Sequence, residues 1–363
     1  MKDDNPAISV IIPLYNVEKF IGECLDSILA QTFTDYEVIV SDDCSTDKSC
    51  EVVESYIPKF NGRLKLITLS HNSGGAAAPR NNGIETAKGK YILFVDDDDA
   101  ITENALEMLF NVAEEFNADV VHSDNRYFLN TDQFTETVGK CNAHSKEVAA
   151  QVKNSNITSI DLAERLKRFI NNNLKWEPWN HLIRREFLLK NNIKLPLLSI
   201  ADDMVFTFFL ICAAENFVVT PNFFYIWRQR QDSNSKQKSS AEKTLKSWGG
   251  DIFLGIQKAD EFMNRYEFFK EHPNYRYAIL EKFQSPHYIL ELYLNNSLES
   301  LDALTRRVLD DVGTNAAVTA VLFNRMNVFN LRLLQMQQAL AQKDAQIKDL
   351  ERQLSEAYNV FTR

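Results

Sequence analysis

The sequence predicts an α/β protein in which helices cover both faces of a mostly parallel β-sheet. Short apolar, β-branched runs alternate with segments of helical spacing over residues 1–125, an order typical of parallel sheets. The runs are almost continuously apolar, as in strands that are buried on both faces. Polar clusters follow directly after several of these runs. Because ligands bind outside the carboxyl ends of the strands in such sheets, these clusters mark the expected site.

Five apolar runs are predicted to form strands: Ile8–Leu14, Tyr36–Val40, Leu64–Leu69, Tyr91–Val95 and Asp119–His122. Apolar residues at helical spacing predict helices, for example over Val17–Ala30 and Met204–Ala214. Phe217–Trp227 is expected to be extended. Thr131–Asn156 is polar and without clear periodicity, so we expect a loop or irregular insertion there.

The pattern changes near residue 240, where strand patterns give way to long helical segments. We therefore expect an α/β domain over residues 1–240, a helical domain over residues 241–330 and a further helix over residues 331–363. In the last segment apolar residues recur every seven positions, at Leu333, Leu340, Ile347, Leu354 and Phe361. This heptad pattern predicts a self-associating coiled coil, although one amphipathic helix packed on its own domain fits it too.

Composition excludes several classes of protein. Acidic residues outnumber basic ones by 50 to 40, which gives a net charge of −10, whereas binding to a nucleic-acid backbone requires a surplus of Lys and Arg. Five scattered cysteines without a C-x-x-C pair argue against a disulfide scaffold and a zinc ribbon. They fit a protein of a reducing compartment.

The chain shows no segment suited to targeting or membrane insertion. Its longest mostly apolar run, Met204–Ala214, is shorter than the roughly 20 residues that span a bilayer. Residues 1–6 lack the basic and apolar regions of a signal peptide. We therefore expect a cytoplasmic protein, and peripheral contact with the inner face of the membrane stays open.

The most informative cluster is the run of four aspartates, Asp96 to Asp99, directly after a predicted strand. Like charges this close raise one another's pKa unless a cation neutralises them. Carboxylates are the ligands that Mg²⁺ and Mn²⁺ prefer, and Mg²⁺ commonly shares its shell with substrate phosphates. The run therefore predicts a divalent-cation site, with a solvated turn that caps the next helix as the alternative.

Three further clusters have both a functional and a structural interpretation. In Val40–Asp47, short polar side chains can bind a base or ribose, or cap the following helix. In Asn72–Gly83, small residues let a ligand approach the backbone and Arg80 offers a cation, or the segment is a tight loop with a salt bridge. In Ala201–Met204, one carboxylate can serve as a general base, or both stabilise a helix N-terminus.

The ordered motifs ISVIIPLYN, VSDDCSTD, GGAAAPRNNGIETAKGKYILFVDDDD, ADD and YIWRQRQDS resemble the inverting family 2 glycosyltransferases with the GT-A fold. The resemblance covers residues 8–235. It implies a GT-A catalytic domain over residues 1–240 and Mn²⁺ or Mg²⁺ as cofactor. It also implies transfer of a hexose or N-acetylhexosamine from a nucleotide diphosphate sugar, with UDP favoured, to an acceptor hydroxyl in polysaccharide or glycoconjugate synthesis.

The resemblance assigns roles to individual residues. Asp203 matches the catalytic base, and Asp98, together with Asp96, matches the metal-binding D-x-D motif. The residues expected to contact the nucleotide sugar are Pro13, Tyr15, Asp43, Arg80, Asn81, Asp96, Asp97, Asp202, Arg228 and Arg230. The residues expected on the acceptor side are Trp179, Asn180 and His181.

Three positions depart from the family pattern: Asp202 replaces the usual Glu, Cys44 a common Gly and His181 a frequent Lys. The change at Asp202 is expected to alter contacts with the acceptor or the donor sugar, whereas Cys44 and His181 do not remove a catalytic group. The expected partners are a nucleotide sugar, a glycan, lipid-linked or protein acceptor, and further copies of the chain bound through the C-terminal helix. A nucleotidyltransferase and a catalytically inactive GT-A-like scaffold stay open as alternatives.

Overall fold

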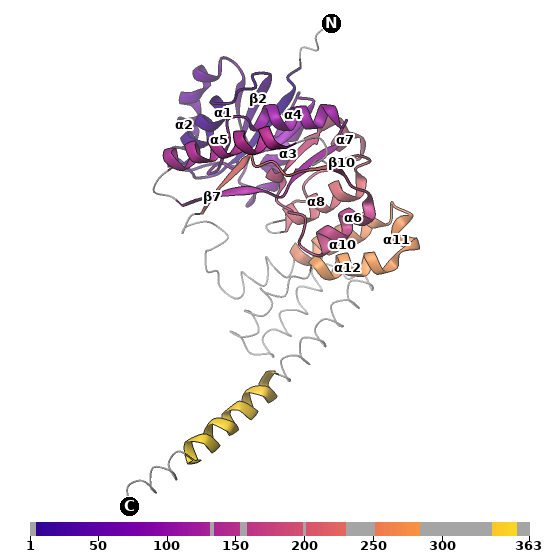
Figure 1. Ribbon diagram of the computed structural model, residues 1–363. Coiled ribbons are helices and arrows are strands. Elements are labelled where there is room, and N and C mark those ends of the chain that lie inside the picture. Colours follow the sequence, from indigo (N-terminus) through magenta and orange to yellow (C-terminus); the bar gives the residue numbers. More distant parts are fainter. Residues whose placement is uncertain are drawn as a thin grey trace, which may run out of the picture. The chain divides into compact units, whose positions relative to one another are not determined.

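A computed structural model describes residues 5–130, 134–152, 158–198, 201–229, 251–283 and 336–353 (Figure 1). The chain divides into two compact units, Met1–Val312 and Gly313–Arg363. The first unit holds the sheets and all the residues with an expected role in the site. In the second unit, residues 336–353 form a helix whose side chains are exposed.

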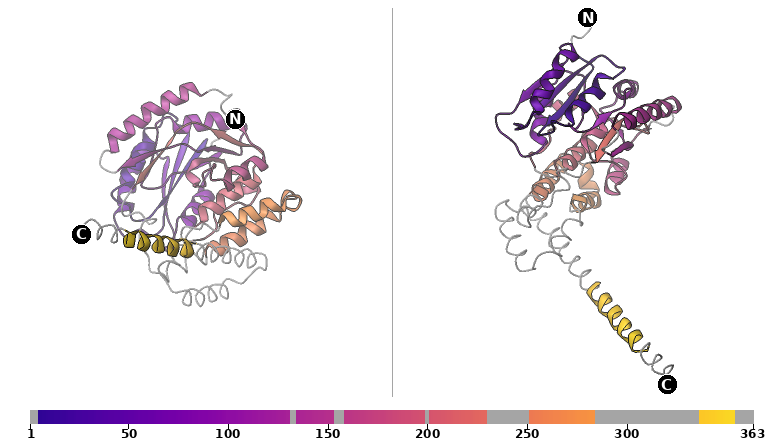
Figure 2. Two further views of the ribbon diagram at one scale, coloured as in Figure 1. Left: turned by 60° about the horizontal axis from the view of Figure 1, so that its bottom comes forward. Right: turned by 90° about the vertical axis from the view of Figure 1, so that its left-hand side faces the viewer.

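An eight-stranded sheet runs through the first unit in the order β3-β2-β1-β4-β9-β6-β10-β8, and helices surround it (Figure 2). Its strands are β1 Ile8–Leu14, β2 Tyr36–Asp42, β3 Leu64–Thr68, β4 Tyr91–Phe94, β6 Val120–Ser123, β8 Thr158–Ser159, β9 His181–Arg184 and β10 Phe217–Thr220. Strands β1 to β4 pair in parallel, as do β6 and β10. The five strands predicted from the sequence are confirmed, each to within two residues at either end.

Strand β9 was not predicted, because four residues are too few to show a periodic pattern. It lies antiparallel between β4 and β6. The carboxyl ends of β1, β2, β4 and β6, with the start of β9, therefore meet at one edge, which we call the carboxyl edge. The amino ends of β4 and β6 and the end of β9 meet at the opposite edge, the amino edge.

Helices pack closely on this sheet. They are α1 Ile21–Leu29, α2 Ser49–Tyr56, α3 Ala77–Thr86, α4 Ala105–Glu115, α6 Leu162–Ile170, α7 Arg185–Lys190 and α8 Asp202–Ala213. Helix α3 approaches β1 so closely that a Cβ at Gly83 would lie 2.3 Å from Ile11 Cγ2. Only glycine fits there without a shift of the core, so Gly83 sets the distance at which α3 presents Arg80.

Helix α8 is apolar on all sides because it is covered on all sides, with Met204 to Cys212 buried. The helices α10 Asp251–Met263 and α12 Pro273–Phe283 pack on α8, α6 and one another. Phe262 stacks on Phe209 with ring centroids 4.2 Å apart. Phe262, Phe269 and Phe283 are buried, so they belong to a helical core.

A second sheet of three strands has the order β5-β11-β7, with β5 Ala100–Ile101, β7 Arg126–Asn130 and β11 Tyr225–Gln229. Helix α5, Phe134–Gln151, packs on β7. The predicted loop over Thr131–Asn156 is wrong, since most of that segment is this helix. Its overall polarity hid a narrow apolar stripe of Phe134, Val138 and Cys141, which packs against Leu129 and Ile226.

The predicted boundary near residue 240 falls in residues 230–250, outside the part that the structure describes. The three predicted domains and the coiled coil therefore stay predictions. All five cysteines are free thiols, as the sequence predicts. No helix among the described residues is long and apolar enough to cross a bilayer.

Candidate active site

Arg80 joins two of the predicted clusters at the carboxyl edge. Its guanidinium is 2.7 Å from Asp96 Oδ1 and 2.7 Å from Asp203 Oδ1, and it lies 3.8 Å from Asp202 Oδ2. The Arg80 side chain is buried, with 4% of its surface exposed. Residues 123 positions apart in the chain thus meet in one ion cluster, so the segments Asn72–Gly83, Asp96–Asp99 and Ala201–Met204 lie together at the carboxyl edge.

The carboxylates of this cluster outnumber the cation. The pKa of Asp203 lies well above the usual value. Although 36% of its side chain is exposed, the main cause of this rise is the desolvation of its carboxylate by the surrounding groups. The charge of Asp202 raises the pKa further, whereas Arg80 lowers it. Burial also raises the pKa of Asp202, against the influence of Arg80. A carboxylate with a raised pKa is a stronger base when ionised, which suits Asp203 to proton abstraction.

The chain enters α8 through a strained residue. Ala201, directly before Asp202 and Asp203, has a φ of 65°, a left-handed conformation that is uncommon for residues other than glycine. Such strain persists where the surroundings fix it and is frequent at functional sites. The two carboxylates also lie in the first turn of α8, where the helix dipole stabilises their charge.

The four aspartates after β4, Asp96 to Asp99, form what we call the acidic turn. Asp96, Asp97 and Asp98 are partly exposed, whereas Asp99 is 1% exposed. Asp99 accepts hydrogen bonds from the Tyr225 hydroxyl at 2.7 Å and from the Arg228 backbone N–H at 2.7 Å. Burial and the neighbouring carboxylates raise the pKa of Asp99. Three of the four aspartates thus lie at the carboxyl edge, and the fourth points into the protein.

The expected base-binding residues lie at the ends of β1 and β2. Pro13 is buried in β1, and Tyr15 is 44% exposed, with its N–H bonded to Asp97 Oδ2 at 3.0 Å. Asp43 is buried and accepts the Ser73 N–H at 2.7 Å. The ends of two strands and the loop before α3 therefore converge beside the acidic turn.

The helix-capping interpretation of Val40–Asp47 fits Asp47, whereas binding of a base or ribose by this segment stays a prediction. Asp47 accepts the N–H and hydroxyl of Ser49 at the start of α2, so it stabilises that helix end. Asp43 instead reaches across to the loop before α3. Cys44 has a φ of 61°, which gives a physical reason why glycine is common at this position in the family.

Two of the residues expected to contact the nucleotide sugar form hydrogen bonds or an ion pair with other parts of the protein. The Asn81 amide accepts the Leu195 N–H at 2.9 Å and donates to the Leu195 carbonyl at 2.8 Å, so it holds the chain ahead of α8. The Arg228 side chain is 2% exposed and pairs with Glu23, while its Nε donates to the Asp98 carbonyl at 2.7 Å. Their contacts with a donor stay predictions. Arg230 lies outside the described residues.

The expected acceptor-side residues are buried at the start of β9. Trp179 stacks on Tyr225, with centroids 3.9 Å apart, and the Asn180 amide donates to Glu177. His181 Nε2 lies 3.0 Å from His122 Nδ1. Burial lowers the pKa of His181 well below its usual value, and the neighbouring His122 lowers it further. These residues shape the inner wall of the carboxyl edge, and their contact with an acceptor stays a prediction.

Sequence reasoning missed several residues at this edge. His122, whose Nε2 lies 2.7 Å from Asp124 Oδ1, extends the buried histidine pair toward the surface. Tyr225 joins the acidic turn to Trp179. Tyr225 is the first residue of the motif YIWRQRQDS, which matched the family without giving it a role. No sequence pattern singled out His122, since it lies within an apolar strand.

The acidic turn can hold a divalent cation only if water and a bound phosphate supply further coordinating atoms. Among the described residues, no three His, Cys, Asp or Glu side chains are grouped to hold a metal ion. Mg²⁺, however, usually binds through one or two carboxylates together with water and substrate phosphates. Asp96 and Asp98, which are partly exposed beside surplus negative charge, suit a site of that kind.

Comparison with known proteins agrees with this geometry. Residues 9–157 match the profile described as glycosyl transferase family 2. The chain is 32% identical over 229 residues to the uncharacterized glycosyltransferase EpsJ of Bacillus subtilis (strain 168), which covers 63% of this chain and 62% of that protein. It is 33% identical over 229 residues to a poly(ribitol-phosphate) beta-glucosyltransferase of Bacillus spizizenii, which covers 62% of this chain and 32% of that protein.

The chain therefore spans about three fifths of the first relative and about one third of the second. Among solved structures, S. aureus TarS 1–349 in complex with UDP-GlcNAc matches with a TM-score of 0.62 at 26% identity. That match covers 84% of this chain and 80% of the TarS chain. It confirms the predicted GT-A-like α/β fold with a mostly parallel central sheet.

Proposed function

We propose that the protein is a family 2 glycosyltransferase that transfers a sugar from a nucleotide diphosphate sugar to an acceptor hydroxyl, and the match of residues 9–157 to that family's profile supports this. One observation carries the proposal. Arg80 holds the D-x-D residue Asp96 and the candidate base Asp203 within 2.7 Å of one guanidinium. A donor bound at the acidic turn and an acceptor beside Asp203 would therefore meet at this cluster.

The proposed donor is a UDP-linked hexose or N-acetylhexosamine. TarS, which shares the fold, has been solved with UDP-GlcNAc and with UDP. In this chain the expected base contacts, Tyr15 and Asp43, lie at the carboxyl edge beside the acidic turn. The proposed acceptor is a hydroxyl of a surface polysaccharide or other glycoconjugate, since two of the relatives with printed activities act on poly(ribitol-phosphate).

In the proposed mechanism, Asp203 accepts the proton of the acceptor hydroxyl as its oxygen attacks the anomeric carbon. The bond between that carbon and the diphosphate breaks in the same displacement, so the anomeric configuration inverts, as it does in inverting glycosidases. Arg80 favours the ionised form of Asp203 and fixes its distance from Asp96. Asp98 and Asp96 would hold a divalent cation, which when bound would neutralise negative charge on the leaving diphosphate.

A screen of nucleotide sugars with Mn²⁺ tests the proposal. We expect release of a nucleoside diphosphate from one donor, and faster release when the acceptor is present. Release of pyrophosphate would instead identify a nucleotidyltransferase. No turnover with any donor, in a protein that is folded by circular dichroism, would favour an inactive scaffold.

We also propose that residues 331–363 associate with further copies of the chain. In the described helix over residues 336–353, the heptad residues Leu340, Ile347 and Leu350 are 67%, 53% and 62% exposed, so apolar surface is available to a partner helix. Deletion of residues 331–363 should reduce the molar mass measured by light scattering. An unchanged mass would contradict self-association through this helix.

A further inference from the structure

Tyr225 connects the two ends of the acidic turn through a single hydroxyl group. The residue is fully buried in β11. Its hydroxyl donates to Asp99 Oδ2 at 2.7 Å and accepts the Asp96 N–H at 3.0 Å. The first and last residues of the turn are thus bound to one atom of a strand 129 residues later in the chain.

The Tyr225 ring is itself held firmly in place. It stacks on Trp179, with centroids 3.9 Å apart and an angle of 10° between the ring planes. The Arg126 guanidinium lies 5.2 Å from the Trp179 ring centroid, and Phe224 meets Tyr225 edge-on. A buried aromatic ring packed on these sides has little freedom, so the hydroxyl is a fixed reference point for the turn.

Arg228, three residues later on β11, completes the attachment. Its backbone N–H bonds Asp99 Oδ1 at 2.7 Å, and its Nε bonds the Asp98 carbonyl at 2.7 Å. The four bonds from Tyr225 and Arg228 thus use the Asp99 carboxylate and the backbone of Asp96 and Asp98. None of these bonds uses the carboxylate of Asp96 or Asp98.

We propose that Tyr225 is a positioning residue for the donor site, which holds the acidic turn so that the Asp96 and Asp98 carboxylates face the donor. In this arrangement Asp99 is the buried anchor of the turn and does not bind the ion. The inference rests on the proposed function. It adds a residue to the site and divides the aspartate run into ligands and an anchor.

Substitution Tyr225→Phe isolates the hydroxyl, because the ring and its stacking on Trp179 remain. The Asp96 N–H then loses its acceptor, and Asp99 loses one of its two donors. Loss of a hydrogen bond to a buried carboxylate should leave the turn less firmly held. We therefore expect the affinity for UDP with Mn²⁺ to fall by about tenfold.

Tyr91→Phe is a matched control. Tyr91 is also fully buried in a strand of the first unit, and its hydroxyl donates to the Glu114 carboxylate at 2.7 Å. It lies at the amino edge, away from the acidic turn. Each variant loses a hydrogen bond from a buried tyrosine hydroxyl to a carboxylate, and Tyr225→Phe also leaves the Asp96 N–H without its acceptor. A loss of binding in Tyr225→Phe that Tyr91→Phe does not share therefore reports on the acidic turn.

Two measurements on the full chain test the proposal: calorimetric titration with UDP and Mn²⁺, and amide hydrogen exchange of the peptide that spans residues 94–99. In Tyr225→Phe we expect about tenfold weaker binding and faster exchange in this peptide. In Tyr91→Phe we expect both to match the wild type.

The inference would be overturned if Tyr225→Phe bound UDP with Mn²⁺ as tightly as the wild type, or if its amide exchange were unchanged. An equal loss of affinity in Tyr91→Phe would also overturn it. If the wild-type protein itself does not bind UDP with Mn²⁺, the proposed function fails in its donor. The exchange measurement, which needs no ligand, then decides separately whether Tyr225 holds the turn.

Discussion

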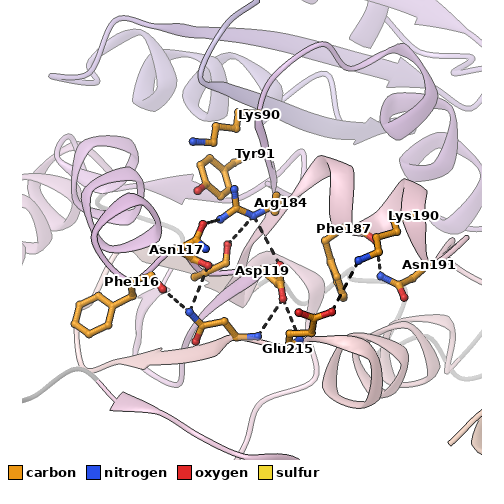
Figure 3. Close-up of polar contacts among 12 residues, drawn as sticks. Lys90, Tyr91, Phe116, Asn117, Asp119, Arg184, Phe187, Lys190, Asn191 and Glu215 are labelled. Carbon is orange, nitrogen blue, oxygen red and sulfur yellow. Dashed lines mark hydrogen bonds and ion pairs between the residues drawn. The ribbon is translucent and has the colours of Figure 1, made fainter.

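At each of these two edges of the central sheet an arginine lies among polar groups, but the balance of charge around it differs between the edges. At the amino edge, Arg184 donates to the Ala118 carbonyl at 3.1 Å and to Asn117 Oδ1 at 2.9 Å, and it lies 3.7 Å from Asp119. The other Asp119 oxygen accepts two backbone N–H groups, those of Glu215 and Asn216. Figure 3 shows Arg184 and Asp119 with their neighbours Asn117 and Glu215.

At the carboxyl edge, Arg80 faces three carboxylates: Asp96, Asp202 and Asp203. The amino-edge cluster matches one cation with one anion and fills the remaining bonds with neutral groups, as expected for a structural role. The carboxyl-edge cluster keeps surplus negative charge. Burial raises the pKa of Asp202 and of Asp203, and the charge of Asp202 raises that of Asp203 further. Perturbed carboxylates of this kind are characteristic of functional sites. The comparison predicts that changes at the amino edge alter stability and changes at the carboxyl edge alter activity.

The largest effect is expected from Asp203→Asn. Loss of the base should lower kcat by about 10²–10⁴-fold, without a loss of melting temperature, because one of several crowded carboxylates is removed. Asp119→Asn, the same change at the amino edge, is the control and should keep kcat while lowering the melting temperature. Wild-type turnover in Asp203→Asn would refute the assignment of the base.

Arg184→Met should give the opposite pattern. It removes the cation beside Asp119 and the side-chain donor to the Ala118 carbonyl, which should lower the free energy of unfolding by about 1–3 kcal/mol. Urea denaturation measures this loss, and kcat per folded molecule should be unchanged. A large fall in kcat with normal stability would show that the amino edge takes part in the reaction.

The pH profile tests the surplus charge directly. Asp203 must be ionised to act as a base, so kcat/KM should fall as the pH drops through its raised pKa, at a pH above that of an ordinary aspartate, about 4. The negative charge of Asp202 contributes to this rise. Asp202→Asn should therefore lower the pKa of Asp203 and move the acid limb of the profile to lower pH. An acid limb that does not move would contradict this coupling.

The smallest effect is expected from the buried histidine pair. Burial lowers the pKa of folded His181, so below the unfolded value of about 6.5 the unfolded chain binds a proton that the folded protein does not. Stability contributed by neutral His181 is thus present above that pH and is lost as the pH falls. His181→Gln should flatten the slope of unfolding free energy between pH 7 and pH 5.5. Equal slopes in variant and wild type would contradict the lowered pKa.

Much of this architecture could be predicted from local sequence. Strands β1 to β4 are mostly apolar runs, and the polar clusters that follow them do converge at the carboxyl edge. Helix α5 was missed because its apolar stripe is narrow, and β9 because it is short. The role of Tyr225 could not be predicted, since its partner Asp96 lies 129 residues away and only the folded pairing of β11 with the acidic turn brings them together.

Calorimetric titration of UDP in the presence and absence of Mn²⁺, with the wild type and Asp98→Ala, tests the central claim most directly. That claim is that the surplus negative charge at the carboxyl edge binds a cation and, through it, a nucleotide diphosphate. We predict that the wild type binds UDP with Mn²⁺ and that Asp98→Ala loses the metal-dependent part of the binding. Equal, metal-dependent binding of UDP by both proteins would contradict the account.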